Sequence, residues 1–147
     1  MRDSRNWSSL RTFGLAFAIV LSPALMQTDA TCHAAGEGHL QLLEVEVAGQ
    51  DMLAFDPMQF SYDIKLPEGV ESIVVRAQPF DPEASVSFNL HDACAPVAHG
   101  EFPPEGEVTI DEVPTGHSVL MVYGHAPGDW GEAAAYTILL TQPSQCL

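Results

Sequence analysis

The feature that most constrains the fold is an alternation of apolar and polar residues that recurs between Leu42 and Leu140. Successive side chains of a β-strand point to opposite faces, so this alternation predicts strands with one buried face. Seven such runs within about a hundred residues predict an all-β sandwich or barrel. The expected strands are 40–47, 60–66, 72–77, 84–90, 107–110, 118–123 and 135–141.

The inward phase of these runs defines the expected hydrophobic core. It consists of Val45, Tyr62, Ile64, Ile73, Val75, Val86, Phe88, Val119, Met121, Tyr136, Ile138 and Leu140, and Phe60 is expected to face inward as well. Residues 91–106 contain no such run and are expected to form one long connection. Long connections in compact domains are either functional or loosely held.

The amino terminus has the pattern of a secretory signal peptide. Arg2, Arg5 and Arg11 precede an apolar stretch, 13–26. That stretch is too short to span a membrane, for which about 20 residues are needed. Small residues follow it, and cleavage is expected after Ala30 or after Ala34.

This pattern divides the chain into three parts. Residues 1–30 are the predicted signal peptide, 31–39 a flexible lead-in, and 40–147 a single domain. The protein is therefore expected to be exported and to be periplasmic, cell-surface or secreted. An uncleaved anchor and a lipid on Cys32 are the alternatives.

The chain is strongly acidic. It has 20 acidic and 5 basic residues, and a formal net charge of −15. Without residues 1–30, Lys65 and Arg76 are the only basic residues left, and the charge becomes −16. Such a surface repels phosphate backbones and anionic lipids, so nucleic acid and direct binding to anionic membranes are excluded as partners. Solubility alone also accounts for acids on exposed strand faces.

A set of residues keeps a characteristic order and spacing over 40–141. It comprises Leu42 and Val45 with Gly49, Leu53-x-Phe55-Asp-Pro57, Tyr62-x-Ile64-x-Leu66-Pro67, Ile73-x-Val75-x-Ala77, Asp81-x-x-Ala84-x-Val86, Gly116 before Val119-x-Met121, and Tyr136-x-Ile138-x-Leu140. In this arrangement the chain resembles the bacterial cadherin-like β-sandwich domain family. The resemblance implies a small immunoglobulin-type sandwich of about seven antiparallel strands. It also implies an exported or surface-associated protein with an accessory role and no assigned chemistry.

The chain departs from that family at two places. Ser118 stands where the family usually has Asn, and the 91–106 connection is longer than the usual one. No Asp-x-Asp or Asp-Arg-Glu string occurs, so the resemblance does not extend to calcium binding.

Cysteine pairing depends on where the signal peptide is cleaved. If cleavage after Ala34 removes Cys32, then Cys94 and Cys146 remain as a pair. A bond between them would close a loop of about 50 residues and contribute about 4 kcal/mol in the chain-entropy model. A Cys32–Cys146 bond is the alternative.

Histidine and cysteine side chains allow a second interpretation, a transition-metal site. His91, Cys94 and His99 lie close together in the sequence and carry suitable donor atoms. Thioethers that would suit copper(I) are those of Met52, Met58 and Met121. No recognised metal-ligand spacing is present, so the main expectation is that the protein holds no metal or other cofactor.

One aromatic residue is the main candidate for ligand binding. Trp130 follows Asp129 in the turn-rich stretch 124–131, where an exposed ring could stack on a sugar or peptide. The alternative is that Trp130 covers the open end of the core.

These observations predict a non-catalytic protein. The sequence has no Gly-x-Ser-x-Gly nucleophile motif, and no enzyme is expected. The expected role is an exported interaction or structural module, with a protein or polysaccharide of the cell envelope as its partner. The alternatives are a periplasmic metal-binding protein that uses His91, Cys94 and His99, and a secreted hydrolase whose residues the sequence does not identify.

Overall fold

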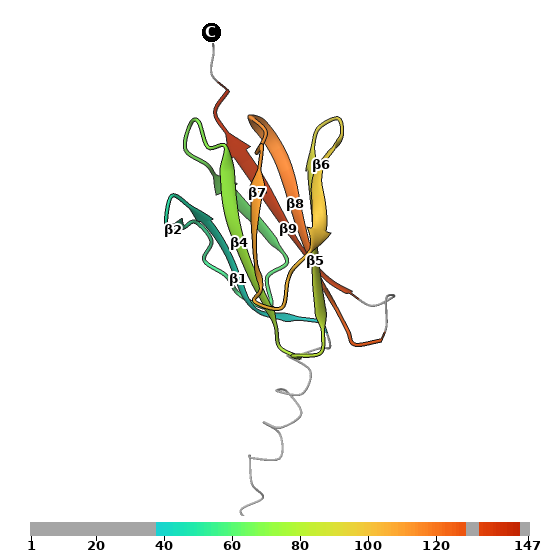
Figure 1. The fold of residues 1–147 in the computed structure, drawn as a ribbon. Helices are drawn as coiled ribbons and strands as arrows, with labels where there is room; N and C mark the ends of the chain where they lie inside the picture. Colours follow the sequence, from blue (N-terminus) through green and yellow to red (C-terminus); the bar gives the residue numbers. More distant parts are fainter. Residues whose placement is uncertain (1–37, 129–132, 145–147) are drawn as a thin grey trace, which may run out of the picture.

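The computed structural model describes residues 38–128 and 133–144, which form two β-sheets packed face to face (Figure 1). The strands are β1 (Leu40–Val47), β2 (Gln50–Asp51), β3 (Ser61–Lys65), β4 (Ser72–Pro79), β5 (Ser85–Asp92), β6 (Pro96–Glu101), β7 (Glu107–Asp111), β8 (Gly116–His125) and β9 (Ala133–Gln142). The expected all-β sandwich is confirmed. The predicted signal peptide, 1–30, lies outside the described residues and stays a prediction.

The strands divide into a four-stranded sheet, β2-β1-β4-β7, and a five-stranded sheet, β3-β9-β8-β5-β6. Neighbouring strands are antiparallel, except that β3 runs parallel to β9. The described residues thus form nine strands rather than about seven, because β2 and β6 were not expected.

The expectation that 91–106 is one long connection is wrong, because β6 lies within it and pairs with β5. Pro96 and Gly100 hid this strand in the sequence, since both residues weaken strand formation. An edge strand tolerates them because one side of its backbone needs no partner.

The core lies between the two sheets, and most of the expected phase is confirmed. Val45, Ile73 and Val75 of the four-stranded sheet are buried. They face Tyr136, Ile138 and Leu140 of β9, which are 0%, 0% and 1% exposed.

The expected phase of β8 is wrong. Leu120 and Val122 are fully buried, whereas Val119 and Met121 lie on the outer face of the five-stranded sheet. Residues 119–122 are apolar on both faces, so period-two alternation does not determine which set points inward. Ser118 is 2% exposed and points inward with Leu120 and Val122.

Two phenylalanines are also less buried than expected. Phe88 points inward but is only half-buried, because it lies beside the edge strand β6, where its ring packs on Phe102 with centroids 5.6 Å apart. Phe60 is 39% exposed, since it precedes β3 rather than lying within it.

The phase of β8 can be tested with two neighbouring substitutions. Leu120→Ala should lower the free energy of unfolding by ~2–5 kcal/mol, because a fully buried side chain leaves a cavity. Met121→Ala, on the outer face, should lower it by less than about 1 kcal/mol. Urea unfolding of both variants measures this difference, and equal losses would contradict the register.

Two tyrosine hydroxyls fix the segment 52–60, which crosses from the four-stranded sheet to the five-stranded sheet. The Tyr62 hydroxyl donates to the carbonyl of Asp56 (2.7 Å) and accepts from its backbone N–H (3.0 Å). The Tyr136 hydroxyl donates to the carbonyl of Pro57 (3.2 Å) and accepts from the N–H of Leu40 (3.1 Å). The crossing segment is thereby held against β1, β3 and β9.

Burial raises the pKa of Tyr136, as it does that of Tyr62, above the ordinary value for tyrosine. Tyr136→Phe should lower the free energy of unfolding by about 1–3 kcal/mol, because the buried N–H of Leu40 loses its acceptor. Tyr123→Phe is the control, since its hydroxyl donates only to the weak acceptor Met121 Sδ (3.2 Å). Equal stability of the wild type and Tyr136→Phe in thermal unfolding would refute this role.

Candidate functional site

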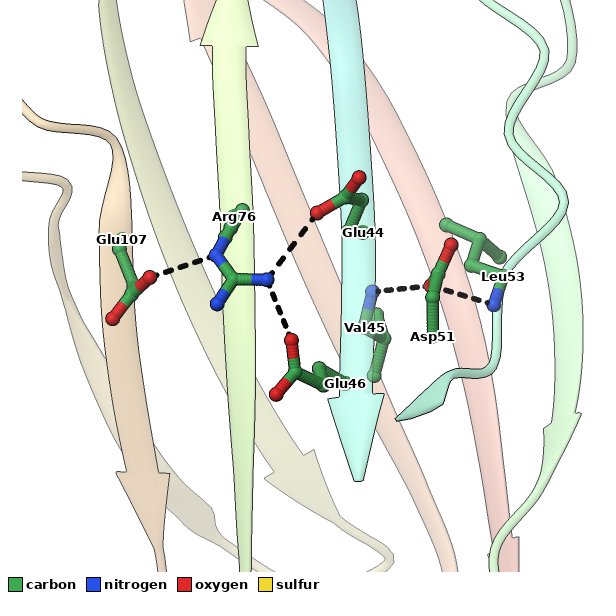
Figure 2. Close-up of polar contacts among 7 residues, drawn as sticks. All are labelled: Glu44, Val45, Glu46, Asp51, Leu53, Arg76 and Glu107. Atoms are coloured by element: carbon green, nitrogen blue, oxygen red, sulfur yellow. Dashed lines mark hydrogen bonds and ion pairs between the residues drawn. The ribbon is translucent and has the colours of Figure 1, made fainter. Parts of the chain in front are cut away.

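The outer face of the four-stranded sheet carries a cluster of acidic side chains around Arg76 (Figure 2). Arg76 Nε donates to Glu107 Oε2 (2.7 Å) on β7. Its Nη1 donates to Glu46 Oε2 (2.6 Å) and Glu44 Oε2 (3.4 Å), both on β1. One guanidinium therefore connects β1, β4 and β7 across the sheet.

The hydrogen bonds that Arg76 donates to Glu107 and Glu46 raise the pKa of Arg76, so the guanidinium stays charged. The cluster holds three carboxylates and one cation, and all its members are partly exposed. The cluster connects strands and is not arranged to bind a cation, because the guanidinium of Arg76 already occupies the position between the carboxylates that a cationic ligand would need.

Arg76→Gln should lower the urea midpoint at neutral pH and low salt, because three carboxylates lose their common counter-charge. The deficit should shrink in high salt, which screens exposed charges, and in acid, where glutamate side chains become protonated. Lys65→Gln is the matched control, since it removes one exposed positive charge from a strand of the other sheet. A deficit that is independent of salt and pH would contradict this role.

A cleft of about 460 Å³ lies at the side of the sandwich, where the chain crosses from β6 to β7, and we call it the Phe80 cleft. Its apolar lining includes Pro79, Phe80, Pro82, Phe102, Pro103 and Pro104. Gln41, Gln78 and Ser85 add uncharged polar groups. Phe80 is 44% exposed, which is unusual for so large an apolar side chain.

Backbone contacts hold the walls of the Phe80 cleft. Phe80 N–H donates to the His39 carbonyl (3.0 Å), and Phe102 N–H donates to the Val86 carbonyl (2.8 Å). Gly106 has a φ of 75°, and a Cβ there would lie 2.6 Å from the carbonyl oxygen of Ala77. Only glycine allows the connection between β6 and β7 to approach β4 this closely.

The predicted metal ligands lie on the β5–β6 hairpin without forming a site. His99 lies opposite Asn89, His91 lies at the other side of a bulge, and Cys94 is exposed in the turn. Backbone N–H groups of Cys94 and Ala95 donate to Asp92 Oδ1, both at 2.7 Å, and they lower the pKa of Asp92. Within 38–128 and 133–144, no three His, Cys, Asp or Glu side chains are arranged to hold a metal ion.

Three other predicted residues, Asp129, Trp130 and Cys146, lie outside the described residues. Among the described residues, 38–128 and 133–144, Cys94 makes no disulfide. β9 ends at the same end of the sandwich as the turn that holds Cys94, since Gln142 pairs with Gly116 and Ser118 with Asp92. The Cys94–Cys146 bond stays a prediction.

Ser87 and His125 form a serine–histidine pair, which is a combination also found in hydrolase active sites. Ser87 Oγ lies 2.9 Å from His125 Nε2. Both residues lie on the outer face of the five-stranded sheet, and neither lines the Phe80 cleft. A serine–histidine pair alone does not define a catalytic site.

Sequence reasoning missed the Phe80 cleft. Phe80 lies in Pro79-Phe-Asp-Pro82, and Phe102 precedes Pro103-Pro104. An aromatic residue next to prolines in a connecting segment was the available signal. The contact between the two segments, however, depends on the sheet topology.

No protein-family model matches the sequence, and neither does any curated protein. Among solved structures, the chain is similar to the extracellular domain of BT3049 from B. thetaiotaomicron, with 10% identity and a TM-score of 0.50, over 77% of this chain and 16% of that chain. The extracellular domain of BT4673 from B. thetaiotaomicron is 13% identical, with a TM-score of 0.45, over 72% and 15% of the two chains. The PmoD soluble domain from Methylocystis sp. is 8% identical, with a TM-score of 0.44, over 69% and 96%.

The similarity to BT3049 supports the β-sandwich fold. The matched region is less than a fifth of the BT3049 and BT4673 chains, so this chain corresponds to one part of much longer proteins. In the described part of the chain, no helix has the length and apolar character needed to cross a membrane.

Proposed function

We propose that the protein is an exported, non-catalytic binding module of the cell envelope, and that the Phe80 cleft is its binding site. The observation that carries this proposal is the exposed ring of Phe80 beside Phe102 and four prolines. Ligand sites combine apolar and aromatic walls with a few polar groups, and this cleft has that composition.

An extended peptide segment of an envelope protein is the partner that this cleft fits best. The connection 102–106, which lines the cleft, joins β6 to β7, and both are edge strands of their sheets, so each has one side of its backbone unpaired. Extended peptides use such backbone groups together with aromatic pockets for side chains. The lining has no charged side chain, which favours an apolar or proline-containing segment over a charged one.

Two further observations support an extracellular binding role. BT3049, whose fold is similar, is described as an extracellular domain, and its β-sandwich forms part of a larger protein. The predicted signal peptide points to the same side of the membrane. Trp130 and Asp129 are proposed as additional contacts, because β8 ends and β9 begins at the end of the sandwich where β4 leads into Phe80.

We also propose membership of the cadherin-like β-sandwich family. Its support is the role that the shared residues have in this chain. Tyr62, Tyr136 and the Asp56-Pro57 pair form the hydrogen bonds that hold the crossing segment. These hydrogen bonds give a structural reason for the order of the motifs Phe55-Asp-Pro57, Tyr62-x-Ile64 and Tyr136-x-Ile138 along the chain.

Substitution of one aromatic residue tests the proposed site. Peptides are selected from a random library against the exported chain, and their affinities are measured for the wild type and for Phe80→Ser. We expect Phe80→Ser to weaken binding at least about tenfold, because a buried anchor ring is lost from the interface.

Met58→Ser is the matched control, since Met58 is 57% exposed and does not line the cleft. It should bind like the wild type, and thermal unfolding should show that both variants fold. Selected peptides that bind Phe80→Ser as tightly as the wild type would place the site elsewhere. Binding that chelators abolish would instead favour the metal-binding alternative.

A further inference from the structure

β3 forms the edge of the five-stranded sheet opposite to β6, and it is paired on one side only, with β9. On either side of β3, the carbonyl of Phe60 accepts a hydrogen bond from β9 (2.8 Å), and the N–H of Leu66 donates one to β9 (2.9 Å). The direction of the backbone groups alternates along a strand. The N–H and carbonyl groups of Ser61, Asp63 and Lys65 therefore point away from β9, toward the free edge.

Open space lies beside this free edge. A groove of about 740 Å³ separates β3 from the crossing segment, and its lining includes Met52 and Leu53 on one side and Ser61 and Asp63 on the other. The crossing segment thus leaves room next to β3. An unpaired strand edge with room beside it is a position at which a further strand can be added.

Charge distinguishes β3 from the other edge strands. β3 carries one acid and one base, Asp63 and Lys65, both of them exposed. β7 carries Glu107 and Asp111, and β6 carries Glu101, but neither strand has a Lys or Arg. β2 is only two residues long. In so acidic a chain, β3 is therefore the edge whose charges can be balanced by a second copy of itself.

Two copies of β3 complement each other when they pair in antiparallel orientation. In such a pair, a residue whose backbone points to the partner strand must face another residue of the same kind. If Ile64 faces its own copy, Asp63 of each chain faces Lys65 of the other, and the two-fold symmetry produces this pair twice. Opposite charges that face each other across strands stabilise a sheet. A register in which Asp63 faces its own copy would instead bring like charges together.

The same register also satisfies the backbone groups of the free edge. Asp63 and Lys65 exchange both N–H···O hydrogen bonds in each facing pair. The next outward residue, Ser61, faces Pro67, which has no N–H to donate. The carbonyl of Ser61 does not need this donor, because it already accepts from Gln59 Nε2 (2.8 Å). The ladder between two copies thus ends at a carbonyl that is already hydrogen-bonded.

We propose that two copies of the chain associate through the free edges of β3, with Asp63 of each copy facing Lys65 of the other. The two five-stranded sheets then form one continuous sheet. β6, from which the connection that lines the Phe80 cleft leaves, lies at the opposite edge of each sheet. The dimer therefore leaves both Phe80 clefts accessible, and a partner with repeated segments would bind both with avidity. The association itself does not depend on the function of that cleft.

Sedimentation velocity of the exported chain over a concentration series tests the association. At physiological salt, repulsion between distant charges is screened, whereas charges in contact still interact. We expect a dimer that is reversible on dilution, with a Kd in the micromolar to millimolar range, as for other small interfaces. A chain that stays monomeric at millimolar concentration would overturn the proposal and leave this edge to a strand of another protein.

Charge reversal tests the contact. Lys65→Asp and Asp63→Lys should each raise the Kd of the dimer at least about tenfold, because like charges then face each other. Glu83→Lys is the matched control, since it changes the net charge as Asp63→Lys does but lies in the exposed β4–β5 turn. It should dimerise at least as tightly as the wild type. Equal weakening by Glu83→Lys and Asp63→Lys would overturn the assignment to β3.

Recombining the two substitutions tests the register. The double variant Asp63→Lys/Lys65→Asp should dimerise like the wild type, because opposite charges face each other again. An equimolar mixture of the two single variants should form a heterodimer, since one chain supplies two acids and the other two bases. Both positions are exposed, so thermal unfolding should show that all variants fold. A double variant that remains monomeric would overturn the register.

Amide hydrogen exchange locates the interface in the wild type. Dimerisation should slow exchange at the N–H groups of Asp63 and Lys65 at least about tenfold, because they become hydrogen-bonded. Exchange at Tyr62 and Ile64 should change less, since their N–H groups already point to β9. Slower exchange confined to residues 96–101 or 107–111 would place the interface on β6 or β7 and overturn the proposal.

Discussion

The structure depends on the way its chain crosses from one sheet to the other between β2 and β3. Tyr62 and Tyr136 hold residues 52–60 with three hydrogen bonds to the backbone of Asp56 and Pro57, and a fourth hydrogen bond joins Tyr136 to the N–H of Leu40 in β1. This crossing brings β3 parallel to β9, whereas every other neighbouring pair is antiparallel. Both tyrosine rings also belong to the core, so one pair of side chains joins the hydrophobic packing to the chain topology.

Charge acts on this framework in opposite ways. The net charge of −15 keeps the protein soluble but also opposes its compact state. Arg76 reduces that repulsion where Glu44, Glu46 and Glu107 are brought together by three strands (Figure 2). The central strands β8 and β9 of the other sheet present uncharged side chains outward, among them Val119, Met121 and Leu139.

The sandwich itself could be predicted because β1, β3 and β4 alternate cleanly, as in Leu43, Val45 and Val47. The phase of β8 could not, because Val119, Leu120, Met121 and Val122 are apolar on both faces and only pairing with β9 selects the buried set. The sites were harder still, because sequence reasoning chose residues by their chemistry. Phe80 and Phe102 become neighbours only through a contact between distant segments.

Gln142 Oε1, which is buried and has no hydrogen-bond partner among the described residues, is informative because it opposes stability. A buried acceptor without a donor costs about 1–3 kcal/mol, out of a net stability of about 5–15 kcal/mol for a typical domain. At the other inward positions of β9, Tyr136, Ile138 and Leu140 are apolar or fully hydrogen-bonded. An apolar residue at 142 would continue that pattern. Local departures of this kind are expected where a residue serves binding rather than folding. Gln142 lies in the wall of a cleft between the β3–β4 and β7–β8 turns, and the charged side chains that line this cleft, those of Glu71, Asp111 and Glu112, are all acidic.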